Sequence, residues 1–116
     1  MDAFTSILQD LHELKEETTE YAIEIVYVLF SKIKSKLQYN MPYGAVSTDS
    51  NNNIRIEWNK NNREVRLIIS PIFGGDCYIY YETNDTYNIE KTVTPSTLAK
   101  WIDWLSEFKE ENFNAT

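Results

Sequence analysis

The side chains that most often carry catalysis or bind metals are few in this sequence. The 116-residue chain has one histidine, His12, and one cysteine, Cys77. A thiol nucleophile needs a neighbour that lowers the thiol pKa, whereas His12 stands among acidic residues and Cys77 lies in an apolar and aromatic run. Zinc and calcium sites need several ligands at set spacings, and no such spacing occurs. We therefore predict no metal centre, no cofactor and no enzyme activity.

Carboxylates near the N-terminus form the second group with chemical potential. Glu13, Glu17, Glu20 and Glu24 recur at intervals that put them on one face of a helix. Paired carboxylates can act as acid and base, but no histidine or arginine stands beside these to separate their pKa values. We interpret them as a solvated acidic face. Together with Asp10 they would also suit an acidic mimic of nucleic acid that occupies a basic groove.

The overall charge restricts the partners of the chain. Eighteen acidic residues against eleven lysines and arginines give a formal net charge of -7. This field repels phosphate backbones and anionic headgroups, so we predict no direct nucleic-acid binding and no membrane binding, and a protein partner with a basic surface. The start of the chain lacks the features of a secretory signal, and the longest apolar stretch, 22–30, is far shorter than the roughly 20 residues that span a bilayer. We expect a cytoplasmic protein.

Three segments have the periodicity of amphipathic helices. Apolar residues recur at intervals of three and four over 4–14 and again over 21–37, where Pro42 closes the helical region. Thr18 can cap a helix, but no glycine or proline enforces a break there, so one long bent helix and two successive helices are both open. The third helix begins at Thr94-Pro95 and is expected to run to about Lys109, with Phe108 on its buried stripe.

The segment between the helices changes to a period of two and predicts an antiparallel β-meander. We expect strands at 54–58, 64–70, 77–82 and 87–93, with a short edge strand at 45–48. The chain is then a single domain, 1–116, of the α+β class: N-terminal helical segments, a four- to five-stranded meander and a C-terminal helix, with the helices on one face of the sheet.

The other face of this sheet carries the candidate site. If Ile54, Ile56, Val65, Leu67 and Ile79 point into the core, the alternating positions point away from it. These positions are Arg55, Arg66, Ile68, Tyr78 and Tyr80. Arginine and tyrosine dominate binding hot spots, so this surface suits a protein partner. Two alternatives stay open: the pairs only stabilise a solvated sheet, or Tyr78 and Tyr80 belong to the core.

The order of these elements carries a resemblance. The chain has a helix, Pro42, a polar turn, the sequence Ile-Arg-Ile-Glu-Trp at 54–58, a hydrophobic strand, a tyrosine-rich strand and a final helix with leucine and tryptophan. Over about its last two thirds it resembles small uncharacterised bacterial proteins, often orphans beside toxin-antitoxin or mobile-element genes. Those proteins usually have glycine in the turn where this chain has Asn51 to Asn53. The resemblance implies a bacterial or phage accessory protein and transfers no functional residue.

Small size, acidic charge and missing catalytic motifs favour a non-enzymatic protein-binding accessory or inhibitor of the antitoxin, immunity or anti-defence type. The acidic mimic of nucleic acid is one alternative. A small-molecule-binding module with a pocket near Trp58 and Trp101 is another. Exposed aromatic residues on the sheet, or the N-terminal helix, would also allow a homodimer.

Overall fold

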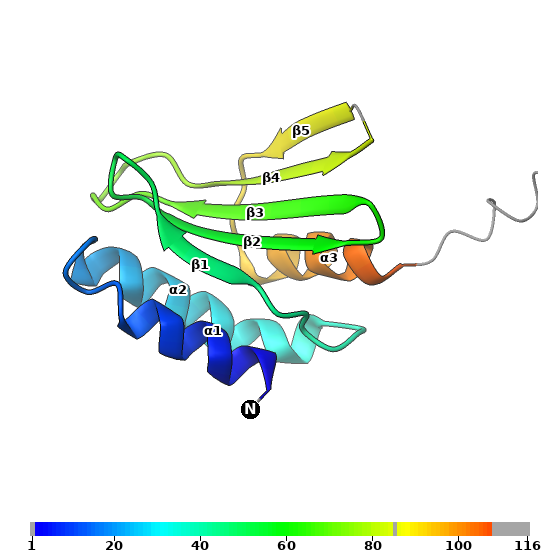
Figure 1. Cartoon of the computed structure of the whole chain (residues 1–116), viewed down its shortest axis with the longest axis horizontal. Coiled ribbons are helices and arrows are strands. Elements are labelled where there is room, and N and C mark those ends of the chain that lie inside the picture. The colour runs from blue at the N-terminus through cyan, green and yellow to red at the C-terminus, as the bar shows by residue number, and fades with distance from the viewer. Residues whose placement is uncertain (1, 85, 108–116) are drawn as a thin grey trace, which may run out of the picture.

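The computed structural model describes residues 2–84 and 86–107 and confirms an α+β fold. Helices and strands follow one another in the expected order (Figure 1). Their bounds are α1 Ala3–His12, α2 Glu20–Ile33, the single-turn 3-10 helix η1 Lys34–Lys36, β1 Ala45–Thr48, β2 Ile54–Lys60, β3 Arg63–Ile69, β4 Tyr78–Thr83, β5 Thr86–Glu90 and α3 Pro95–Ser106.

The five strands form one antiparallel sheet in the order β1-β2-β3-β4-β5. Two-residue loops close two of its hairpins. Asn61 and Asn62 join β2 to β3 with φ of 55° and 62°, which is the left-handed geometry that tight hairpins require and that asparagine tolerates. The loop between β4 and β5 begins at Asn84, with φ of 53°. The asparagines thus favour the tight turns of these two hairpins.

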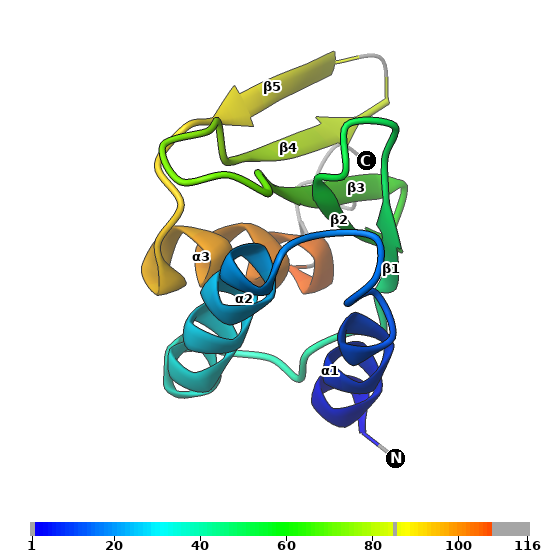
Figure 2. The same ribbon diagram turned by 90° about the vertical axis from the view of Figure 1, so that its left-hand side faces the viewer.

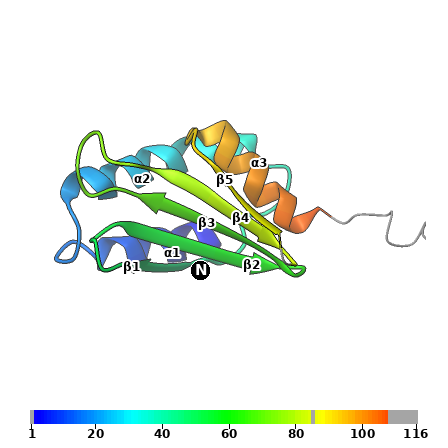
Figure 3. The same ribbon diagram turned by 90° about the horizontal axis from the view of Figure 1, so that it is seen from above.

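All three helices lie against the same face of the sheet. Figure 1 shows the sheet above and the helices below, and Figure 3 views the sheet from its outer side with the helices behind it. The inner face is lined by alternating strand residues that are fully buried against α1, α2 and α3. These strand residues are Ile54, Ile56, Trp58, Val65, Leu67, Ile69 and Ile79. The predicted alternation of the three central strands is therefore confirmed.

The N-terminal region forms two helices. Asp2 caps α1 by accepting a hydrogen bond from the Thr5 N-H at 2.8 Å, and Thr19 caps α2 by accepting from the Ala22 N-H at 3.2 Å. The expected cap, Thr18, instead donates its hydroxyl to the Asn52 carbonyl at 2.9 Å. The chain reverses direction between the two helices, which brings α1 and α2 side by side below the sheet (Figure 2).

The C-terminal helix begins as predicted and ends earlier. Thr94 and Thr97 cap α3 reciprocally, each hydroxyl accepting from the backbone N-H of the other. The helix ends at Ser106, because Glu107 has extended backbone geometry. The expected continuation to Lys109, with Phe108 on the buried stripe, lies outside the described residues.

Four predicted strands differ from the observed ones by small shifts. The strand expected at 54–58 continues to Lys60, because Asn59 and Lys60 pair with β3 and only Asn61 and Asn62 form the turn. The segments expected at 64–70 and 77–82 form at 63–69 and 78–83, and β5 ends at Glu90 instead of Val93. The edge strand at 45–48 forms as predicted. Arg63 and Thr83 flank the two-residue hairpin loops, so these loops set where β3 begins and where β4 ends. Among the described residues, no helix is long and apolar enough to cross a membrane.

Candidate functional site

The outer sheet face brings the predicted site residues together. Arg66 is paired with Tyr80 across β3 and β4, and Ile68 is paired with Arg55 on one side and Tyr78 on the other. All five residues point away from the helices. We use the name outer sheet face for this surface of β2 to β5, which consists of Arg55, Glu57, Glu64, Arg66, Ile68, Tyr78, Tyr80, Glu82, Tyr87 and Ile89.

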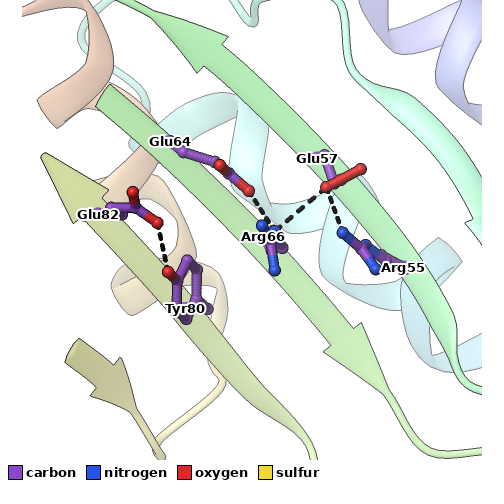
Figure 4. Close-up of polar contacts among 6 residues, drawn as sticks. All are labelled: Arg55, Glu57, Glu64, Arg66, Tyr80 and Glu82. Atoms are coloured by element: carbon purple, nitrogen blue, oxygen red, sulfur yellow. Dashed lines mark hydrogen bonds and ion pairs between the residues drawn. The ribbon is translucent and has the colours of Figure 1, made fainter. Parts of the chain in front are cut away.

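Ion pairs hold the two arginines of this face in place (Figure 4). The Glu57 Oε1 atom lies 2.7 Å from Arg55 Nη2 and 3.1 Å from Arg66 Nε, and Arg66 Nε also pairs with Glu64. Partial burial of Arg66 disfavours its charge, but the hydrogen bond to Glu64 and the charges of both carboxylates outweigh this and raise the pKa of Arg66. Arg66 is therefore a fixed positive charge between two acids.

Tyr80 joins this network to the last strand. The Arg66 guanidinium lies over the Tyr80 ring, 4.6 Å from its centroid, and Tyr80 stacks on Tyr87 of β5 at 5.7 Å. The Tyr80 hydroxyl donates to the Glu82 carboxylate, and this hydrogen bond raises the pKa of the Tyr80 phenol. The face is thus an ordered row running Glu57, Arg66, Tyr80 and Tyr87 across four strands.

Two of the predicted residues offer less surface than the sequence suggested. Ile68 is only 6% exposed, because its neighbours Arg55 and Tyr78 flank it in the adjacent strands. Tyr78 is half-buried. Sequence reasoning did not include Tyr87 and Ile89, which are 67% and 44% exposed on the same face. The available signal was that Tyr87 and Ile89 alternate with polar residues along the predicted strand, which puts both on one face. Their exposure also depends on β5 being the edge strand of the sheet.

An apolar patch formed by α2 and the loop between β3 and β4 was also missed. Phe73 is 87% exposed and meets the Tyr21 ring edge-on at a centroid distance of 5.8 Å. Beside Tyr21, a shallow hollow of about 320 Å³ is lined by α2 residues that include Ile25 and Val28. The sequence signal was Phe73 itself, an aromatic residue directly before Gly74, which has a φ of 82°.

The acidic residues do not form the single helical face that was predicted. Asp10 lies on α1, Glu20 and Glu24 lie on α2, and Glu13 and Glu17 lie in the turn between the two helices. The prediction was wrong because it extended one helical period through the break before Thr19. All five carboxylates are exposed, and Glu17 accepts a hydrogen bond from the Thr48 hydroxyl at 3.4 Å.

The two tryptophans proposed to border a ligand pocket are packed against other rings. Trp58 is fully buried and stacks on Phe30 at 6.4 Å, and its indole N-H donates to the Pro42 carbonyl at 3.1 Å. Trp101 stacks on Tyr81 at 3.7 Å. Both indoles thus pack against aromatic rings, and the Trp101 Nε1 atom is buried without a hydrogen-bond partner among the described residues.

His12 and Cys77 lie in unrelated parts of the structure. His12 is exposed in the last turn of α1, while Cys77 is half-buried before β4 and its Sγ accepts from the Ser70 N-H at 3.4 Å. Within residues 2–84 and 86–107, no group of three histidine, cysteine or carboxylate side chains could hold a metal ion.

Comparison with protein-family models, with curated proteins and with solved structures gives no match to this chain. The function must be inferred from the surface of the molecule itself.

Proposed function

We propose that the chain is a non-enzymatic protein-binding accessory or inhibitor protein, of the antitoxin, immunity or anti-defence type, that docks its partner on the outer sheet face. The observation that carries this proposal is the row of arginine and tyrosine side chains on a sheet face that the helical layer leaves uncovered (Figures 3 and 4). The partner is expected to be a bacterial or phage protein with a basic surface that offsets the net charge of -7.

The order within this face favours binding. Ion pairs and ring stacking already hold Arg66 and Tyr80, so a partner immobilises few additional rotamers when it covers them. Arg55 adds an unsatisfied donor, since its Nε is buried without a hydrogen-bond partner among the described residues.

The test compares two charge-matched double variants of the full-length chain as bait in a lysate of the native host. Arg66→Glu with Tyr80→Ala alters the outer sheet face, and Lys36→Glu with Tyr27→Ala makes the same change of charge and the same loss of a ring on the helical side. Both control positions are exposed. Captured proteins are quantified by mass spectrometry, and circular dichroism establishes that both variants are folded.

We expect a specific partner that is captured by the wild type and by the control and lost from the Arg66 and Tyr80 variant. Equal capture by all three chains would overturn the outer sheet face as the docking site. Loss only from a Phe73→Asp variant would move the site to the α2 patch.

Ionic strength separates this proposal from the acidic mimic of nucleic acid. A hot-spot interface with aromatic anchors persists when salt rises, whereas a mimic that uses Asp10, Glu13, Glu17, Glu20 and Glu24 loses its partner as the Debye length falls from about 10 Å at 0.1 M to about 3 Å at 1 M. Capture at 0.1 M salt that vanishes at 0.5 M, and is unaffected by Tyr80→Ala, would favour the mimic.

A further inference from the structure

Within residues 2–84 and 86–107, strand β5 forms an open edge of the sheet. All but the last of its residues are exposed, and in Figure 2 it lies at the end of the sheet farthest from α1. The opposite edge strand, β1, has four residues and contacts α1. An edge that is neither covered nor short is a template for pairing with another strand.

The register shows which backbone groups of β5 face outward. The two-residue loop makes Thr83 and Thr86 the closing pair of the β4-β5 hairpin, and in such hairpins the closing pair is hydrogen-bonded. Because hydrogen-bonded and non-bonded pairs alternate, Asn88 bonds to β4 while Tyr87 and Ile89 direct their N-H and C=O groups away from it.

A side-chain contact agrees with this assignment. The Ile89 N-H donates to the Asn88 side-chain Oδ1 atom at 2.8 Å, which places this donor at the free edge. Asn88 therefore occupies one of the outward donors in the single chain. It acts as a local cap on an otherwise available edge.

We propose that β5 pairs with β5 of a second copy of this chain, antiparallel and with Asn88 on the two-fold axis, to form a continuous ten-stranded sheet. In this register Tyr87 of each copy faces Ile89 of the other, which gives four backbone hydrogen bonds and two aromatic pairs with a β-branched side chain. The proposal is independent of the partner protein, because it concerns the isolated chain.

The charge distribution favours a second copy at this edge. Glu90 is the one charged residue of β5, and Lys91 follows it, so the segment 86–91 has no net charge in a chain of net charge -7. The proposed register sets Glu90 opposite Thr86, so no like charges oppose each other. Helix α1, which carries Asp10, lies at the end of the molecule farthest from β5 (Figure 2).

The size of the contact sets the expected strength. Five residues at about 3.4 Å each give a contact edge of about 17 Å. A single pair of strands of this length buries less surface than the roughly 800 Å² per partner of a standard protein interface. We therefore expect a weak, concentration-dependent dimer. Sedimentation velocity between about 10 µM and about 1 mM purified protein should detect it, because this range covers the dissociation constants expected of a weak complex.

Matched variants of two residues test the geometry. Ile89→Pro removes the outward donor at a position where proline is tolerated, while Ile89→Ala removes the same side chain and keeps the donor. Asn88→Ala removes the cap. Asn88→Ala frees the Ile89 N-H of each copy for a hydrogen bond across the dimer. We therefore expect this variant to dimerise roughly fivefold or more strongly than the wild type. We expect Ile89→Pro to dimerise at least about tenfold more weakly than Ile89→Ala.

Three results would overturn the proposal: wild type and Asn88→Ala both monomeric at about 1 mM, Asn88→Ala dimerising no more strongly than wild type, or Ile89→Pro and Ile89→Ala dimerising equally. Amide exchange gives a second measurement on the wild type. Exchange of the Tyr87 N-H should slow as protein concentration rises, and exchange that does not depend on concentration would also contradict pairing through β5.

Discussion

A methyl group added at Gly44 should disturb the central tryptophan of the core. An ideal Cβ at this position would lie 2.7 Å from Trp58 Nε1, closer than Cβ atoms approach other atoms in folded proteins, and 3.0 Å from Cε2, which is a tight contact. The indole has little room to retreat, because it is fully buried, stacks on Phe30 and donates to the Pro42 carbonyl. Glycine at 44 is thus required by a close approach.

The expected cost follows from two terms. Overpacking a buried site typically costs about 1–3 kcal/mol. Moving the indole also breaks its hydrogen bond to the Pro42 carbonyl, which is worth about 1 kcal/mol. Gly44→Ala should therefore lower the free energy of unfolding by about 2–4 kcal/mol, and the midpoint of thermal unfolding by about 8 °C or more.

A double-mutant cycle with Trp58→Phe tests this origin. Phenylalanine lacks the indole N-H that lies nearest the added methyl group, so Gly44→Ala should cost about 1 kcal/mol or less in the Trp58→Phe background. Urea unfolding followed by far-ultraviolet circular dichroism measures all four chains without relying on tryptophan fluorescence. A cost of Gly44→Ala that is the same in both backgrounds would refute the steric explanation.

Two further predictions concern local hydrogen bonds. Thr94→Ala should destabilise the protein by about 1 kcal/mol in urea unfolding, because it removes the cap of α3. The control Ser96→Ala, at an exposed position, should change stability by about 0.5 kcal/mol or less. Equal effects of the two substitutions would contradict the capping role. Burial raises the pKa of Asp49, but hydrogen bonds from Asn53 and Asn51 outweigh it and hold this pKa below 3.8. The stability that Asp49 adds relative to Asp49→Ala should therefore be fully present above the unfolded pKa of about 3.9 and be lost as pH falls through the lower folded pKa. Urea titrations of both chains at pH 7, 5 and 3 measure this difference in the free energy of unfolding. A difference that stays constant down to pH 3 would disprove the prediction.

Much of the fold could be predicted because its signals are local. The alternation in β2, β3 and β4 named the buried residues Ile56, Leu67 and Ile79, and Thr94-Pro95 marked the start of α3. The sequence leaves open whether the N-terminal region forms one helix or two, since no proline or glycine enforces a break there. The break depends on the Thr19 cap and on tertiary contacts such as the hydrogen bond from Thr18 to Asn52.

The site was only partly predictable for a related reason. Strand parity alone placed Arg66 and Tyr80 on one face, but the partners of a side chain depend on the register of the neighbouring strands. That register put Glu57 and Glu64 around Arg66 and exposed Tyr87 at the edge.

The sequence by itself determined the class of fold, the order of its elements and the direction in which each strand residue points, because helix and strand periods are properties of adjacent residues. The tertiary structure decided how much of each side chain meets solvent. Ile68 is covered by Arg55 and Tyr78, while Phe73 is left exposed beside Tyr21. Exposure is set by neighbours distant in sequence, and those neighbours are assigned only when the chain has folded.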